Sequence, residues 1–271
     1  RYYPAAFTAA LLRAQPMGFY SPASLIGDAR RHGVHVRGVD VNASAAAATL
    51  EKPETSPGQP VIRLGLAAVR NLGSDPAALI VAGQPYRDLE DLARRTRLPA
   101  PALEALAMAG ALGCFGMSRR EALWAAGAAA TIRAGQLPGT TVGLATPPLA
   151  AMTAAEETFA DLWATGASGT HPVAHIREPL TERGVIGAAE LRTARAGAAV
   201  VVAGLVTHRQ QPGTARGVVF LSLEDETGIA GAEVRLVDRR GPVERGEERA
   251  AVPVAELDVL VHRERRRRLR R

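Results

Sequence analysis

The chain has 271 residues, of which 47% are hydrophobic and only 4% aromatic, so its core must be built mainly from alanine, leucine and valine. The single cysteine, Cys114, excludes an internal disulfide and fits a reducing cytoplasm, and no apolar run approaches the roughly 20 residues of a membrane-spanning helix. The net charge of +6 belongs to the tail: without residues 263–271, the 33 basic and 27 acidic residues become 26 of each. Charge therefore gives no evidence that the body binds nucleic acid.

The first 60 residues predict two helices, a short strand and a loop. Residues 5–14 carry apolar side chains at helical spacing, and a segment with proline and glycine ends that helix. Ser21, followed by proline, begins a second helix that runs over 22–31. Residues 34–41 alternate in polarity as a strand does, and residues 51–60, with three prolines, predict a loop.

Residues 64–135 predict helices joined by short turns. The expected helices are 64–70, 75–81, 89–95, 102–109 and 119–130. Glycine-containing turns follow the first of these helices at 71–73 and the fourth at 110–113. Residues 135–150 are rich in glycine, proline and threonine and predict a flexible linker.

The remainder begins with a helix and continues with strands. Thr153 and Glu156 form a capping box for a helix that reaches Trp163. Apolar β-branched residues then predict strands. These strands are 199–206, 218–225 and two weaker stretches around Val234 and Val259.

The most specific motif is Gln-Pro-Met-Gly-Phe-Tyr at 15–20, with the residues that follow it up to Ser44. It resembles the fingers region of DnaE-type bacterial DNA polymerase III alpha subunits, and the residues of the Gln-Pro-Met-Gly-Phe-Tyr motif resemble those of the error-prone branch. Arg30 and Arg31 end the second predicted helix, where the helix dipole favours cations. They are either a capped surface helix end or a contact with DNA phosphate.

Two helix-hairpin-helix patterns follow, similar to the paired module behind the fingers in this family. The first has as its turn Arg70, Asn71, Leu72 and Gly73. Such a turn points backbone N–H groups at a DNA phosphate, without reading sequence. The second, around 106–124, has a nearly all-apolar turn and is expected to be the structural partner. Its Arg119 and Arg120 are either a solvated helix start or a further DNA contact.

The strands resemble the start of the family's OB domain, a fold that grips single strands with basic and aromatic side chains. The candidate contacts here are Arg209, Arg216 and Phe220. We interpret Phe220 as a core residue, with a stacking role as the alternative. Before these strands, His171 is expected to bond to backbone in a linker. After Gly228 the resemblance stops, which suggests a shifted reading frame and a barrel that lacks strands.

The resemblance implies a multi-domain fold: a mainly helical N-terminal part followed by a partial β OB-fold. The expected parts are the end of the fingers at 1–50, a tandem helix-hairpin-helix domain at 51–135, a linker with a helix at 136–197, the start of an OB-fold at 198–228 and a divergent basic tail at 229–271.

No catalytic residue or metal site is expected on this chain. Polymerases bind two metal ions with a small set of aspartates, and Asp40 has no carboxylate partner at close spacing. The family's catalytic carboxylates precede its fingers, so the resemblance implies a Mg²⁺-dependent parent polymerase and a fragment that is inactive alone.

Two other functions remain open, a stand-alone DNA-binding accessory protein and the product of a pseudogene. A lysine-dependent DNA ligase is excluded, because the only lysine, Lys52, precedes Pro53 and Glu54 instead of the x-Asp-Gly that such an enzyme requires. The resemblance further implies DNA repair by damage-tolerant (translesion) synthesis in the cytoplasm, with template–primer and single-stranded DNA, accessory mutasome proteins and a sliding clamp as partners.

Overall fold

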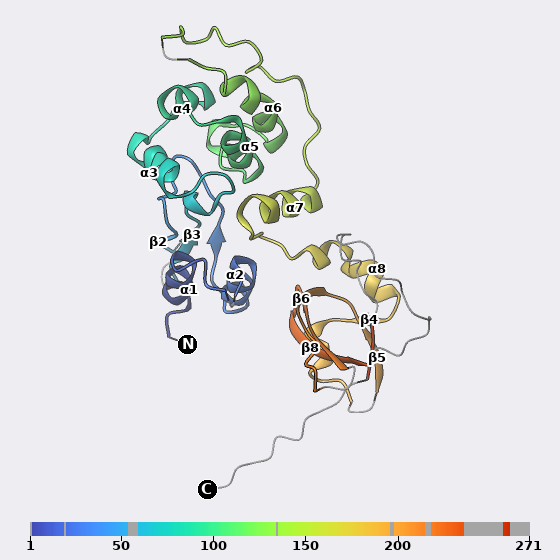
Figure 1. Cartoon of the computed structure of the whole chain (residues 1–271). Helices are drawn as coiled ribbons and strands as arrows, with labels where there is room; N and C mark the ends of the chain where they lie inside the picture. The colour runs from blue at the N-terminus through green and yellow to red at the C-terminus, as the bar shows by residue number, and fades with distance from the viewer. Residues whose placement is uncertain are drawn as a thin grey trace. The chain divides into compact units, whose positions relative to one another are not determined.

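The computed structural model describes residues 2–18, 20–53, 59–133, 135–195, 198–214, 218–235 and 257–260, the last range and 232–235 by their backbone alone. The chain divides into two compact units, Arg1–Thr170 and His171–Arg271, whose helices and strands are drawn in Figure 1. Each unit has its own cluster of buried apolar side chains. The division falls inside the segment 136–197. The predicted order, helices first and strands afterwards, is confirmed.

The first unit is mainly helical and also holds a small sheet. Its helices are α1 (Pro4–Arg13), α2 (Pro22–Arg31), α3 (Ser74–Gly83), α4 (Leu89–Thr96), α5 (Ala100–Met108), α6 (Arg119–Ala129) and α7 (Ala154–Thr165), with 3₁₀ turns η1 (Leu66–Ala68) and η2 (Gly113–Phe115). Its strands are β1 (Val36–Arg37), β2 (Thr49–Glu51) and β3 (Val61–Arg63), where β3 pairs parallel with β1 and antiparallel with β2.

Side-chain caps begin the helices where the sequence predicts them. The Ser21 hydroxyl accepts a hydrogen bond from the N–H of Ser24 at the start of α2. Ser118 and Thr153 form complete capping boxes with Glu121 and Glu156 at the starts of α6 and α7. Because each cap satisfies N–H groups that a helix leaves free, these boundaries are set locally.

The predicted helix 64–70 is wrong. Leu64 directly follows β3 and is still bonded to β1, since its N–H donates to the carbonyl of Arg37 at 3.1 Å. Asn71 has a φ of 60°, which ends any helix, so that only the 3₁₀ turn η1 fits between them. The expected strand 34–41 is likewise reduced to the two residues of β1.

Alanine and leucine build the core of the first unit, as composition predicts. Ile80, Leu92, Leu103 and Leu106 are fully buried. Buried alanines of α5 and α6, among them Ala105 and Ala126, complete the packing. Small side chains let helix backbones approach closely, which makes this hairpin of helices a rigid platform.

The second unit packs short helices against two three-stranded sheets, β4-β5-β9 and β6-β7-β8. Its elements are η3 (Pro172–Ile176), α8 (Arg177–Glu182), β4 (Val185–Ile186), α9 (Ala188–Leu191), β5 (Ala199–Val202), β6 (Leu205–Gln210), β7 (Val218–Asp225), β8 (Gly228–Arg235) and β9 (Leu257–Leu260). Both weakly predicted strands are confirmed, as β8 and β9.

Two details of the second unit differ from expectation. The strand predicted at 199–206 breaks after Val202, because Gly204 lies against the backbone of Glu224, where an added Cβ would be 2.9 Å from the carbonyl oxygen. Sheet structure also continues past Gly228, since β8 pairs with β7 from Asp225 to Val218. The expectation of missing strands is therefore wrong for β8; the reading-frame hypothesis itself remains a prediction.

Candidate nucleic-acid interface

The first hairpin turn exposes its backbone and buries one anchor. Arg70, Asn71 and Gly73 are exposed, whereas Leu72 is 4% exposed and packs in the core. Asn71 and Gly73 both have left-handed backbone, with φ of 60° and 71°. Leu72, predicted as a DNA contact, is thus the side chain that anchors the turn, and its neighbours face outward.

Free backbone donors gather where this turn enters α3. Within the described part of the chain, the N–H groups of Asn71, Gly73, Ser74 and Asp75 make no hydrogen bond, and no side chain caps α3. The N-terminus of a ten-residue helix also carries a partial positive charge. Asp75 in the first turn opposes an anion there, so affinity for phosphate needs a nearby cation.

Arg70 supplies that cation and ties the turn to α7. Its guanidinium carbon lies 5.1 Å from the centroid of the Trp163 ring. Its backbone N–H donates to the carbonyl of Ala164 at 2.7 Å. Leu72 anchors the turn in the core, and α7 binds it from the other side. These two attachments fix the direction of the turn's unbonded backbone N–H groups.

Sequence reasoning missed this role of α7. The helical pattern identifies Trp163 only as the end of a helix, although Trp163 and Phe159 are four residues apart and are 44% and 61% exposed. Two large aromatic side chains at that spacing lie on one face of a helix. In a chain with only 4% aromatic residues, the four-residue spacing of this pair is a signal that the sequence contains.

In the second hairpin, between α5 and α6, hydrogen bonds within the chain use several of the N–H groups at the two helix ends, although those of Arg119 and Arg120 make none among the described residues. At the end of α5, the N–H groups of Gly110 and Ala111 bond to Ala107 and Leu106 at 3.0 and 2.9 Å. At the start of α6 the Ser118 capping box occupies the helix N-terminus. The cap and the Glu121 carboxylate thus occupy part of this helix N-terminus, and the role of the second hairpin as the structural partner remains a prediction.

The arginines at the start of α6 are engaged by α7. Arg119 donates to the carboxylate of Asp161 at 2.8 Å and to the carbonyl of Met108. Arg120 pairs with Glu156 at 2.7 Å. These contacts join α6 to α7, and the structural interpretation of both arginines accounts for them; their contact with DNA remains a prediction.

Arg30 and Arg31 differ in exposure and partners. Arg30 donates to the carbonyls of Ser168 and Val36, and burial lowers its pKa, with the nearby Asp161 carboxylate acting in the opposite direction. Arg31 lies on the surface, 3.6 Å from Asp28.

Arg30, Arg119 and Asp161 line one cavity of about 230 Å³. The two arginines reach it from different helices, α2 and α6, and both interact with the carboxylate of Asp161 on α7. Arg30 thus braces the unit, and Arg31 is free enough to meet solvent or phosphate.

In the second unit the two candidates that the structure describes, Arg209 and Phe220, do not share one face of the sheet. Arg209 pairs with Leu221 and Phe220 with Gln210, so in this antiparallel pair Arg209 and Phe220 point to opposite faces. Arg216 lies outside the described residues. Phe220 is 38% exposed, so its interpretation as a core residue is wrong.

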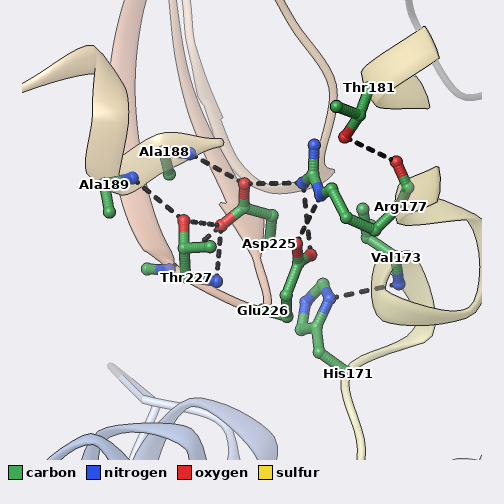
Figure 2. A network of polar contacts seen from close by, with 10 residues as sticks. His171, Val173, Arg177, Thr181, Ala188, Ala189, Asp225, Glu226 and Thr227 are labelled. Atoms are coloured by element: carbon green, nitrogen blue, oxygen red, sulfur yellow. Dashed lines mark hydrogen bonds and ion pairs between the residues drawn. The ribbon is translucent and has the colours of Figure 1, made fainter. Parts of the chain in front are cut away.

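A buried polar network organises this unit (Figure 2). Asp225 accepts hydrogen bonds from the side chain of Arg177, from the N–H of Ala188 and from Thr227. Arg177 also pairs with Glu226, and this raises the pKa of its guanidinium. The network joins the β7–β8 turn to the helices before it, so it is a brace and not an exposed site.

His171 accepts a hydrogen bond from the N–H of Val173 at 3.3 Å, which confirms the predicted backbone role (Figure 2). Asp40 likewise binds backbone groups, since its carboxylate accepts from the N–H groups of Asn42 and Ala43 at 2.7 and 3.1 Å.

Among the described residues, no three His, Cys, Asp or Glu side chains gather as a metal site would need. No described helix is long and apolar enough to cross a membrane.

Comparison with known proteins places this geometry in context. Residues 33–122 match a helix-hairpin-helix motif family. Over 233 residues the chain is 56% identical to the error-prone DNA polymerase of Mycolicibacterium paratuberculosis and 54% identical to that of Mycobacterium tuberculosis strain H37Rv. The error-prone DNA polymerase of Nocardia farcinica is 53% identical over 241 residues. These matches cover 84% of this chain, which spans about a fifth (21%) of each of these relatives.

Proposed function

We propose that this chain, a homologue of part of the error-prone DNA polymerases, is the portion of such an enzyme that holds template–primer DNA. The observation that carries the proposal is the turn from Arg70 to Gly73, with exposed backbone donors and an exposed arginine inside a matched helix-hairpin-helix region. Two other predictions form part of it: Mg²⁺ and the catalytic carboxylates belong to the rest of the polymerase, and the parent reaction is damage-tolerant, template-directed DNA synthesis in the cytoplasm.

The chemistry of the turn suits a polymerase. Backbone N–H groups bind a phosphate oxygen whatever the base, and Arg70 adds Coulomb attraction. Contacts of this kind fix the register of the duplex without reading its sequence, so the enzyme can translocate. The brace from Arg70 to Ala164 keeps the donors in place before DNA arrives, which lowers the entropy lost on binding.

Binding of a fluorescent blunt duplex, followed by anisotropy at several salt concentrations, tests the proposal. Arg70→Ala should weaken binding about fivefold and lower the salt slope by about one, because one phosphate contact is lost. Arg87→Ala is the matched control, since its side chain is 80% exposed and the change in net charge is the same. Equal effects of the two substitutions would show that only net charge matters and would overturn the proposal.

A second experiment asks whether this chain alone synthesises DNA. In primer extension with Mg²⁺ and all four nucleotides, the chain should incorporate nothing above background, because the proposal assigns the catalytic carboxylates to the rest of the polymerase. Incorporation would contradict the assignment. Mutasome proteins and a sliding clamp are the proposed partners of the complete enzyme, and pull-down with purified clamp checks the second of them.

Single-strand binding by the His171–Arg271 unit is a second proposed activity, in the manner of an OB-fold. The supporting observation is the exposed face of β6 and β7, where Gln210 and Phe220 form a cross-strand pair. Phe220→Ala should weaken binding of a single-stranded oligonucleotide several-fold. No change in that affinity would remove this proposal and leave the one for the hairpin intact.

A further inference from the structure

The exposed aromatic face of α7 stands apart from the rest of the first unit. Phe159 and Trp163 are 61% and 44% exposed and one helical turn apart. Large aromatic side chains bury 150–250 Å² when they enter a core, so leaving two of them in solvent is costly. Exposed aromatic patches mark surfaces that bind something.

This face is continuous with the hairpin turn. Arg70 covers the Trp163 ring at 5.1 Å, and the Arg70 N–H bonds to the adjacent Ala164. Of the three carboxylates of α7, those of Glu156 and Asp161 are paired with arginines of α6, and that of Glu157 is exposed in the first turn. Beside the aromatic rings there is therefore an exposed cation and a turn with free N–H donors.

We propose that Trp163, backed by Arg70 and extended by Phe159, is a stacking platform for unpaired bases of single-stranded DNA beside the hairpin turn. The proposal rests on the proposed function of that turn and adds the class of DNA that it receives: a duplex with a single-stranded extension. Only unpaired bases offer free faces for stacking, since those of a duplex are covered by their neighbours.

The surroundings favour nucleic acid over an apolar protein partner. A partner helix or strand would have to desolvate the Arg70 guanidinium and the free N–H groups of the turn. A phosphodiester backbone satisfies these donors while its bases cover the rings. One strand thus uses both halves of the surface, phosphate at the turn and bases on α7.

Fluorescence tests the platform directly, because the chain has two tryptophans. In a Trp124→Phe background Trp163 is the only tryptophan, and a single-stranded oligonucleotide should quench its emission as a base stacks on it. A blunt duplex of equal length should quench much less. Unchanged emission at saturating oligonucleotide, with binding verified by anisotropy, overturns the platform.

Affinity gives the second readout. Trp163→Ala should weaken binding of a single strand, and of a duplex with a single-stranded extension, about tenfold, and that of a blunt duplex less than about twofold. Trp163→Phe should restore most of the loss. Trp124→Ala on α6 is the matched control, since Trp124 is 56% exposed and should leave all three affinities unchanged.

The possible outcomes distinguish the stacking platform from the proposed binding of DNA by the turn from Arg70 to Gly73. If Trp163→Ala matches its Trp124 control while Arg70→Ala still weakens blunt-duplex binding selectively, the platform is wrong and the hairpin function stands. If Trp163→Ala weakens all three ligands equally, Trp163 only positions Arg70 and the platform is again wrong. If Arg70→Ala has no selective effect, the hairpin function itself fails.

Discussion

Removal of the Asp225 carboxylate should unfold the His171–Arg271 unit more effectively than any surface change. The side chain is 1% exposed. One oxygen accepts from Arg177 at 3.0 Å and Ala188 N–H at 2.7 Å. The other accepts from the Thr227 N–H and hydroxyl at 2.8 and 2.7 Å and from the Gly228 N–H at 3.0 Å (Figure 2). One carboxylate therefore joins α8, α9 and the β7–β8 turn.

The size of the effect follows from what alanine leaves behind. Asp225→Ala breaks a buried ion pair, which costs about 3–5 kcal/mol. It also leaves the buried N–H groups of Ala188 and Gly228 without a partner, at ~1–3 kcal/mol each. Because these terms overlap, we expect a loss of about 5 kcal/mol. Domains have only about 5–15 kcal/mol of stability in all, so much of the unit should unfold.

Glu226→Gln is the matched control for this prediction. Glu226 binds the same Arg177, but its side chain is 22% exposed and glutamine keeps an acceptor oxygen. We expect it to cost about 1 kcal/mol or less. The comparison isolates the number of buried partners, since both substitutions remove one negative charge near the same guanidinium.

Hydrogen exchange of the full chain, read by mass spectrometry, measures both variants. Amides of β7 and β8 should lose protection in Asp225→Ala and keep it in Glu226→Gln. Amides of α5 and α6 should be unchanged, because they belong to the other compact unit. Variants that differ by less than about 1 kcal/mol in the free energy of opening would refute the reasoning from buried partners.

Three further predictions concern the first unit. Hydrogen bonding from Arg63 lowers the pKa of the Glu51 carboxyl below 4.5. The stabilisation from this ionised carboxylate is therefore complete at neutral pH and is lost as the pH falls through the lowered pKa. The unfolding free energies of wild type and Glu51→Gln, measured by urea titration, should converge as the pH falls below 4.5. Burial and the Asp40 carboxylate raise the pKa of Cys114 to about 11, so alkylation by iodoacetamide at about pH 8 should be at least about tenfold slower than that of free cysteine and accelerate towards pH 11. Gly65→Ala should lower the unfolding free energy by about 3 kcal/mol in urea titrations followed by tryptophan fluorescence, because its Cβ would lie 2.3 Å from the carbonyl carbon of Ala47.

Features encoded by neighbouring residues could be predicted from the sequence. The caps at Ser21, Ser118 and Thr153 lie where a hydroxyl precedes helix-forming residues. The strand 218–225 has the predicted bounds, because its β-branched and apolar residues lie between turns. In each case the interactions that set the bounds of the helix or strand join residues only a few positions apart in the sequence.

Features that depend on distant contacts could not be predicted. The bond from Arg70 to Ala164 joins segments that no local pattern connects. The opposite orientation of Arg209 and Phe220 depends on the bulge in β6, where the register shifts between Val206 and His208. One inserted residue reverses the face of every side chain beyond it, and alternation in the sequence does not record where that happens.

The contrast between the two hairpins shows why a motif alone does not locate a phosphate site. Both contain a glycine with left-handed backbone, Gly73 at the N-cap of α3 and Gly110 directly after the end of α5. In the second, Ser118 and its own glutamate fill the helix N-terminus, so a phosphate would have to displace a carboxylate that is already bonded there. In the first, glycine stands at the N-cap and provides no side chain, which leaves the donors to a ligand. We therefore expect the residue at the N-cap to influence which hairpin a phosphate reaches. Serine would be strained at Gly73, whose φ is 71°, so the test removes the cap of the other hairpin. Ser118→Gly should strengthen binding of a blunt duplex in the anisotropy titration, and an unchanged affinity would contradict this reasoning.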